Sequence, residues 1–209
     1  MEKKHIITLS GKPGSGKSST ADKVAELLSY TRYSAGDLVR KSLRKKHMTL
    51  DEFNHQAMTD HTMDQTIDEE LRKLRNERDI VIDSRLGFYW IPESFKVYLD
   101  LDDDVATARI FKDTVSGRDD EFEGKATTLQ DVQRQVRSRM DNEKKRFMSL
   151  YGTNPYNNAN FDLIVNTSRH SPQTVALVVF DTYQQWLHSD EWVQVVSGVP
   201  AGYSYKNEY

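Results

Sequence analysis

Short apolar segments alternate with segments of helical periodicity along most of this chain. The apolar segments have strand length, are flanked by turn or helix signals, and cover residues 5–10, 31–34, 79–83, 95–101 and 161–166. Strands that alternate with helices predict right-handed βαβ units and a parallel sheet. We therefore expect an α/β fold of three layers, with a five-stranded parallel sheet between helices.

Two segments exceed what a minimal sheet-and-helix core needs. Residues 36–76 are a helical block between the second and third strands, in which Thr49 to Glu52 form a capping box that opens a helix through about residue 59. Apolar residues then recur at helical spacing, at Met63, Ile67, Leu71 and Leu74. Residues 113–126 are polar, and we expect them to be a mobile loop over a site. An ordinary surface excursion is the alternative for each segment.

Residues 189–209 differ in composition from the rest of the chain. Residues that break regular structure occur at Ser197, Gly198, Pro200 and Gly202. Aromatic side chains accompany them, at Trp192, Tyr203, Tyr205 and Tyr209. We expect one domain over residues 1–188, followed by an aromatic tail. The tail is either unstructured or an arm that docks on its own subunit or on another.

Composition narrows the range of partners. The chain has 209 residues and a net charge of −3, which fits one domain and argues against a general binder of nucleic acid or of membrane surfaces. It has no cysteine, which excludes disulfides, a thiolate nucleophile and a zinc–thiolate site. The first apolar run is too short for a signal peptide, and residues 175–180, the longest run elsewhere, are too few to span a membrane. We expect a cytoplasmic protein without membrane or nucleic-acid partners, with a monomer as the simplest state and self-association through the tail as the alternative.

A phosphate-binding loop follows the first predicted strand. Residues 11–18 read GKPGSGKS, which satisfies the pattern G-x-x-x-x-G-K-[ST] between a strand and a helix. Glycines let backbone N–H groups turn toward phosphate oxygens, and the helix start adds the positive end of its dipole. Lys17 would reach the β- and γ-phosphates, and the Ser18 hydroxyl would ligate Mg²⁺. The residues expected to bind the nucleoside triphosphate are Gly11, Lys12, Pro13, Gly14, Ser15, Gly16, Lys17, Ser18 and Ser19.

Polar clusters follow the second and third strands, at the edge where open parallel sheets bind ligands. Ser34, Asp37 and Arg40 could read a base edge and hold a phosphate. The alternative is that Asp37 caps a helix and pairs with Arg40. After the third strand, Asp83 is placed to hold Mg²⁺ or its waters, and Arg85 to bind an acceptor phosphate. A purely structural aspartate at the strand end is the alternative there.

A long helix predicted over residues 129–149 carries a third cluster. Arg139, Glu143 and Arg146 follow one another at i, i+4 and i+7 and so share one helix face. Charged helix faces are often only solvated. Two arginines on either side of a glutamate, beside a mobile loop, instead indicate a role in phosphoryl transfer. That reaction needs cations next to the equatorial oxygens of the transferred group.

Together these motifs resemble the cytidylate kinases, in particular the compact type found in archaea. The similarity is carried by residues 7–18, 33–40, 52–54, 83–86, 143–146, 151–152 and 162–168. It implies a P-loop nucleoside monophosphate kinase fold, with residues 36–76 as the monophosphate-binding insert and residues 113–126 as a small lid. ATP and Mg²⁺ are the implied cofactors, and CMP or dCMP is the implied acceptor.

The resemblance also implies roles for single residues. Those that would serve the monophosphate are Ser34, Asp37, Arg40 and Arg85, and those that would hold its nucleoside end are Glu143 and Arg146. The lid-side arginines would be Arg109, Arg118 and Arg139, and the residues that would act in catalysis are Lys17, Arg118 and Arg139. The chain departs from the family at Ser84, where glycine is usual, and in the acidic residues that surround Arg118.

The chemistry agrees with these residues. A nucleoside monophosphate is already anionic near neutral pH, because its second pKa is about 6, so no general base is needed. A carboxylate such as Asp37 or Glu143 would favour the amino group of cytosine over the carbonyl of uracil. The open alternatives are a P-loop kinase of another nucleotide or of a shikimate-like alcohol, and a non-catalytic nucleotide-binding module that uses the tail as its interaction arm.

Overall fold

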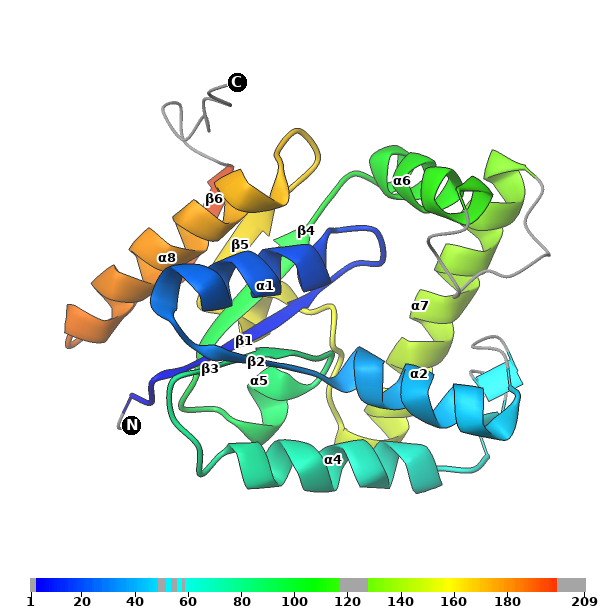
Figure 1. Cartoon of the computed structure of the whole chain (residues 1–209), viewed down its shortest axis with the longest axis horizontal. Helices are drawn as coiled ribbons and strands as arrows, with labels where there is room; N and C mark the ends of the chain where they lie inside the picture. The colour runs from blue at the N-terminus through cyan, green and yellow to red at the C-terminus, as the bar shows by residue number, and fades with distance from the viewer. Residues whose placement is uncertain (1–2, 49–51, 54–55, 58, 117–127, 199–209) are drawn as a thin grey trace.

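One parallel sheet organises the chain, and the computed structural model describes residues 3–48, 52–53, 56–57, 59–116 and 128–198. Within these residues the sheet has six strands in the order β2-β3-β1-β4-β5-β6, and all neighbours are parallel (Figure 1). The strands are β1 (Ile6–Gly11), β2 (Thr31–Ser34), β3 (Ile80–Asp83), β4 (Phe95–Asp100), β5 (Leu163–Asn166) and β6 (Val195–Gly198). The phosphate-binding loop therefore leaves the middle of the sheet, between the ends of β3 and β4.

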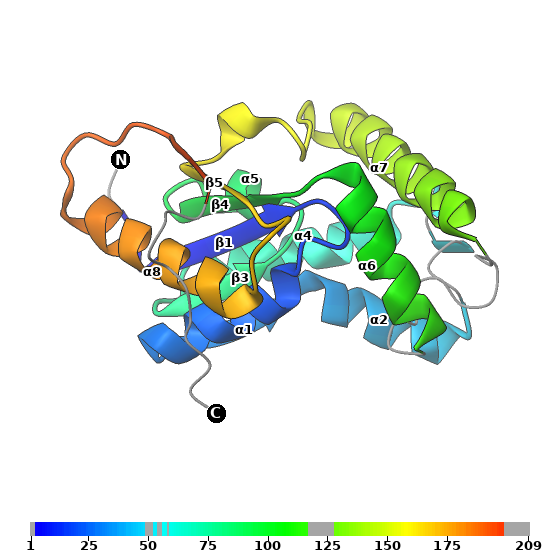
Figure 2. The ribbon, with the colours of Figure 1, turned by 90° about the horizontal axis from the view of Figure 1, so that it is seen from above.

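Helices cover both faces of the sheet (Figures 1 and 2). One face carries α1 (Lys17–Leu28) and α8 (Pro172–His188), and the other carries α4 (Thr62–Leu74), α5 (Gly87–Trp90) and α7 (Leu129–Tyr151). Successive side chains of a strand alternate between the faces, so Ile7 and Leu9 pack with α1 and α8 whereas Ile6 packs with α4. Because both faces are buried, the central strands read as continuous apolar runs in the sequence.

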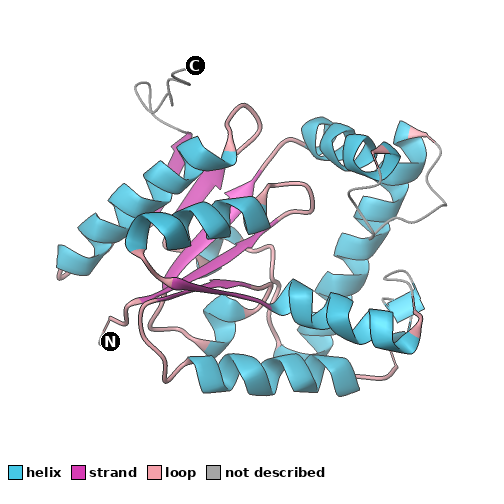
Figure 3. Cartoon of the chain, in the orientation of Figure 1, coloured by secondary structure: helices cyan, strands magenta, loops and turns pink. Residues whose placement is uncertain are grey.

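Two further helices, α2 (Ala35–Lys46) and α6 (Asp103–Val115), lie beyond the carboxyl ends of the strands (Figure 3). α6 packs on α7 through Ile110 and Val132, and α2 packs through Leu43 on the segment that carries Phe53. A capping box at Thr128 and Asp131 begins α7, which the sequence had placed correctly. A 3₁₀ turn, η2 (Asn158–Asn160), precedes β5. Both helices at the strand ends therefore pack on other parts of the chain through buried apolar side chains.

The predicted fold class is confirmed, with a correction at the sheet edge. The predicted strands all form, within a few residues of their expected ends, but the sheet has six strands and not five. The additional strand, β6, includes Ser197 and Gly198, which we had expected to break regular structure. These residues pair with Val165 and Asn166 of β5, so pairing along the sheet edge outweighs their weak strand preference.

The first half of the expected tail is docked on its own subunit. Trp192 packs edge-on against Phe95, with ring centroids 6.1 Å apart, and its indole N–H donates to the Asp162 carbonyl at 3.2 Å.

Residues 199–209 lie outside the described residues, as do Thr49 to Asp51 of the predicted capping box and residues 117–126 of the predicted lid. Among the helices described, none combines the length and the apolar character that crossing a membrane requires.

Candidate functional site

Glycines shape the loop between β1 and α1. Gly14 has φ of +76°, and a Cβ there would lie 3.1 Å from the Ala106 carbonyl oxygen. Gly16 also has φ of +76° and is the N-cap of α1. Side chains are disfavoured at this φ, so the glycines allow the turn that directs the loop and the start of α1 into one cavity. The predicted phosphate-binding loop therefore has the backbone that its sequence requires.

Asp83 is the centre of a polar cluster at the end of β3. Its Oδ1 lies 2.8 Å from Lys17 Nζ, and its Oδ2 accepts hydrogen bonds from the Ser18 hydroxyl at 2.7 Å and from Arg32 at 3.3 Å. Burial by itself would raise the pKa of Asp83, but Lys17, Ser18 and Arg32 outweigh it and hold the pKa at about 2. The carboxylate is therefore charged at neutral pH and lies beside the hydroxyl that was predicted to ligate Mg²⁺.

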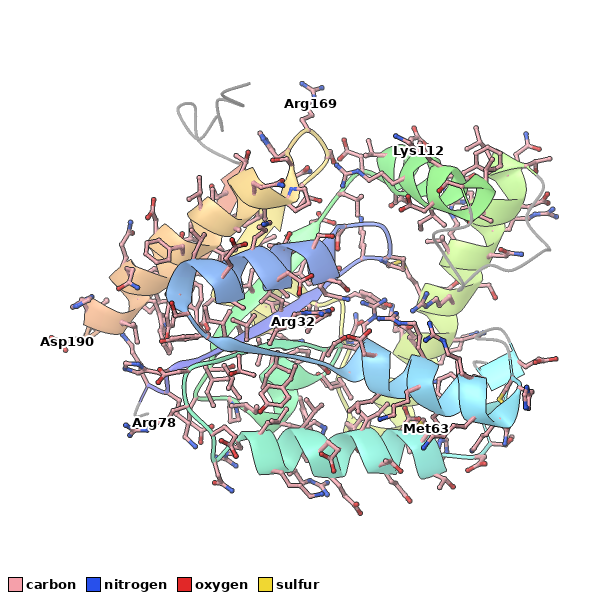
Figure 4. The ribbon with its side chains drawn as sticks, viewed as in Figure 1. Arg32, Met63, Arg78, Lys112, Arg169 and Asp190 are labelled. Atoms are coloured by element: carbon pink, nitrogen blue, oxygen red, sulfur yellow. The ribbon has the colours of Figure 1, made fainter. Side chains whose placement is uncertain are left out.

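Arg32 extends this cluster toward α2. It lies between α1 and α2 (Figure 4), where its guanidinium also reaches Asp22 at 3.2 Å and Asp37 at 3.6 Å. Asp37 in turn accepts from Arg40 at 2.5 Å, and the Ser34 hydroxyl caps α2 by accepting from the Asp37 N–H. The pairing of Asp37 with Arg40 agrees with the structural alternative stated for this cluster, but the residue that caps the helix is Ser34 and not Asp37.

Glu143 is the centre of a second cluster, on α7. Its Oε2 accepts from Arg85 at 2.9 Å and from the Tyr156 hydroxyl, and its Oε1 accepts from Arg139 at 3.0 Å. Burial would raise the pKa of Glu143, but Arg85 and Arg139 lower it well below its usual range. Arg85 also donates to the Gly11 carbonyl at 2.8 Å. Glu143 therefore fixes two arginines beside the phosphate-binding loop.

Arg109 holds the loop from the α6 side. It donates to the Thr167 carbonyl at 2.8 Å and to the Gly14 carbonyl at 3.4 Å. Lys12 is bound differently from Lys17, because its ammonium pairs with Asp100 at 3.0 Å and with Asp103 at 3.3 Å. Arg109 therefore connects α6 to the phosphate-binding loop after β1 and to the residue that follows β5.

These clusters face one cavity of about 570 Å³. The predicted site residues that line it are Lys12, Pro13, Gly14, Ser15, Gly16, Lys17, Ser18, Ser19, Arg40, Asp83, Arg85, Arg109, Arg139, Glu143 and Arg146. Gly11, Ser34 and Asp37 are described but do not contribute to the lining, and Arg118 lies outside the described residues. The structure therefore brings together side chains from distant parts of the sequence in a space large enough for small-molecule ligands.

Sequence reasoning missed functional candidates on α4. Asp64 and Asp68 are buried on the cavity wall, where Asp64 pairs with Arg146 at 3.3 Å between Oδ2 and Nε. Burial raises the pKa of Asp64, and the charge of Arg146 opposes this. Their spacing of four residues, next to an apolar helix face, was a usable signal. Arg32 was also missed, although a charged residue within a strand that ends at a ligand-binding edge is unusual.

The chain is similar to a family of known domains and to several cytidylate kinases. Residues 10–126 match a family model described as an AAA domain. The cytidylate kinase of Halobacterium salinarum is 34% identical over 179 residues, which are 84% of this chain and 88% of that protein. The cytidylate kinase of Archaeoglobus fulgidus is 32% identical over 175 residues, which are 83% of this chain and 91% of that protein.

Other matches are more distant or cover less of the relative. An S-adenosylmethionine-dependent nucleotide dehydratase of Lacinutrix mariniflava is 32% identical over 181 residues, but the chain spans only 36% of that protein. Among solved structures, the shikimate kinase of Bacteroides thetaiotaomicron superposes with a TM-score of 0.59 at 12% identity, covering 88% of this chain and 98% of that one. The shikimate kinase of Acinetobacter baumannii gives a TM-score of 0.58 at 13% identity, with 90% and 97% covered. At these identities the structural matches show a shared fold.

Proposed function

Because this chain belongs to the cytidylate kinase family of P-loop kinases, we propose that it transfers the γ-phosphate of ATP to CMP or dCMP. The matches to cytidylate kinases cover more than four-fifths of the chain, so the assignment rests on the whole domain and not on the phosphate-binding loop alone. A kinase for nucleoside monophosphates has to hold two anionic nucleotides end to end and keep water from the transferred group.

The phosphate-binding loop and Asp83 are suited to bind the phosphate donor, ATP, together with Mg²⁺. Lys17 lines the cavity beside the glycine turn and can neutralise charge on the phosphates of ATP. Ser18 and Asp83 present oxygen atoms 2.7 Å apart, and a hydroxyl next to an ionised carboxylate is a donor set that suits Mg²⁺. The bound metal ion would neutralise the charge that develops on the phosphates during transfer.

Three arginines in the cavity are suited to bind the phosphate of the acceptor nucleotide. Arg40, Arg85 and Arg139 come from α2, the end of β3 and α7, and all line the cavity that contains Lys17. Fixed guanidinium groups bind phosphate oxygens in a bidentate way and stabilise the charge of the transition state. Glu143 keeps Arg85 and Arg139 in place through hydrogen bonds of 2.9 and 3.0 Å. This convergence of arginines on the cavity of the phosphate-binding loop is the observation that carries the proposal.

The state of Asp83 disfavours an alcohol as the acceptor. Transfer to a neutral hydroxyl needs a general base with a pKa near the working pH. Asp83 has its pKa held at about 2 and its oxygens engaged by Lys17, Ser18 and Arg32, so it is a poor base. Asp37, the other carboxylate considered for that role, does not contribute to the cavity lining. A phosphate acceptor needs no such base.

A substrate panel tests this proposal. We expect ATP with Mg²⁺ to support turnover with CMP and dCMP at higher kcat/KM than with UMP, AMP, GMP or shikimate, measured by coupled detection of ADP. A higher kcat/KM for any of the other acceptors would replace CMP as the substrate. Nucleotide binding without transfer to any acceptor would support the non-catalytic alternative.

A further inference from the structure

Helix α2 carries a concentration of positive charge. It has five basic side chains and one carboxylate, whereas the whole chain has a net charge of −3, so the rest of the chain is more negative than the chain as a whole. Three of the basic side chains, Lys41, Lys45 and Lys46, are exposed, and in the described part of the chain none of them has a carboxylate within salt-bridge distance. These three lysines form the basic end of α2.

The basic end of α2 continues from the edge of the cavity. The first half of the helix lines the cavity through Gly36, Val39 and Arg40, and the helix then runs on away from the sheet (Figure 1). Lys41 follows directly on Arg40, and the three lysines do not contribute to the lining. Their charges therefore lie beside the space that a ligand would occupy and not within it.

Helix stability accounts for only part of this charge. Lys45 and Lys46 lie in the last turn of α2, where cations interact favourably with the helix dipole. Lys41 lies more than one turn before the end of the helix, beyond the reach of that effect. A role toward a ligand of opposite charge would account for all three lysines.

Exposed charge beside a cavity acts mainly on how fast an ionic ligand arrives. A phosphate monoester carries a charge of about −1.5 to −2 near neutral pH, and a chain of negative net charge repels it at long range. A local cationic surface raises the association rate constant, and salt screens this effect. Charges at the edge of a site change the association rate constant, whereas buried partners change the dissociation rate constant.

We propose that the basic end of α2 steers the anionic acceptor nucleotide toward the cavity. This inference rests on the proposed function, because it takes a nucleoside monophosphate as the acceptor. The lysines act at long range and do not touch the bound nucleotide. They therefore raise kcat/KM through faster association, and they leave kcat at saturating nucleotide and the choice of base unchanged.

The test compares two variants that have the same change in net charge. One variant replaces the basic end of α2, as Lys41→Gln, Lys45→Gln and Lys46→Gln together. The control replaces three exposed lysines of α4 and α7 that do not line the cavity, as Lys73→Gln, Lys144→Gln and Lys145→Gln together. Line shapes in ³¹P NMR titrations give the association and dissociation rate constants for CMP in both variants.

We expect a difference that depends on salt. At an ionic strength of about 0.02 M the association rate constant should be about 10-fold lower in the α2 variant than in the control, with dissociation rate constants within about 2-fold of each other. At about 0.3 M the difference in association should fall below about 2-fold, because charges are then screened beyond about 8 Å. Equal association rate constants at low ionic strength overturn the inference, as does a difference that persists at high ionic strength.

Two further comparisons complete the test. In the wild type, the association rate constant for CMP should fall about 10-fold between these ionic strengths, and a constant rate overturns the inference even if the α2 variant fails to fold. If another nucleoside monophosphate is the preferred acceptor, the proposed function is wrong. The same comparison with that nucleotide then decides the inference, because steering depends on charge and not on the base.

Discussion

Lys17 Nζ lies 2.8 Å from Asp83 Oδ1, so the loop lysine and the carboxylate at the end of β3 form a buried ion pair. Lys17→Ala would remove the cation expected to face the phosphates and leave Asp83 with less compensation. We expect kcat to fall by about 10²- to 10³-fold, the cost of removing one preorganised electrostatic contact to the transition state. Steady-state kinetics measure this, with Lys23→Ala on the exposed side of α1 as the control.

The same ion pair predicts how stability depends on pH. The pKa of Asp83 is about 2 in the folded chain, below the ordinary value of 3.8, so its charged form stabilises the fold above pH 4. That contribution, about 2 kcal/mol, is lost as pH falls toward 2. In Asp83→Asn, the free energy of unfolding by urea should fall less steeply with pH below 5 than in the wild type. Asp141→Asn, which removes an exposed charge on α7, is the control, and a slope equal to that of Asp83→Asn would contradict the prediction.

Glu143 should matter more for stability than a single hydrogen bond does. Glu143→Gln removes the charge that the half-buried Arg85 and Arg139 share, and we expect a loss of at least about 2 kcal/mol in the free energy of unfolding. Tyr156→Phe removes only the hydroxyl that donates to Glu143 and should cost about 1 kcal/mol. Urea titrations measure both variants. If Glu143→Gln were the more stable of the two, the arginines would not depend on its charge.

Asp37 should affect how tightly the acceptor binds and not which base is chosen. Its carboxylate holds Arg40 at 2.5 Å, and Arg40 lines the cavity whereas Asp37 does not. We expect Asp37→Ala to raise the KM for CMP several-fold, because Arg40 loses a partner that positions it. The ratio of kcat/KM for CMP to that for UMP should stay within about 2-fold of the wild type. A collapse of this ratio would return the base-reading role to Asp37.

Trp192 tests whether the residues after α8 are part of the domain. It packs on Phe95 and donates to the Asp162 carbonyl, so Trp192→Ala should lower the free energy of unfolding by about 2 kcal/mol. The neighbouring Val193 is 81% exposed, and Val193→Ala should have little effect. Thermal unfolding of the two variants measures the difference, and equal melting temperatures would mean that this docking adds no stability.

The sequence was informative where chemistry and periodicity are local. The central strands were recognisable because their residues are buried on both faces, as in β1 and β3. The loop at residues 11–18 was recognisable because its glycines and Lys17 have fixed spacing. Helical spacing also brought Arg139 and Glu143 together correctly, at 3.0 Å.

Contacts between distant segments could not be predicted in this way. Arg146 turns from Glu143 toward Asp64, which lies on another helix, and local spacing carries no information about that partner. Similarly, Ser197 and Gly198 have weak strand preference, and their place in β6 depends on pairing with the edge of β5. The pairing of Asp64 with Arg146 and the pairing of β6 with β5 therefore depend on the tertiary fold and not on local spacing.

Arg32 has a consequence for the way the two halves of the site communicate. One guanidinium serves Asp83 beside the loop and Asp37 beside the acceptor arginine, at 3.3 and 3.6 Å. A ligand that changes the charge around Asp83 would change how strongly Arg32 interacts with Asp37. The interaction of Asp37 with Arg40 would then change as well. Thermodynamic reciprocity requires the effect to be equal in both directions. If the two nucleotides bind as proposed, this single side chain would make their affinities depend on each other.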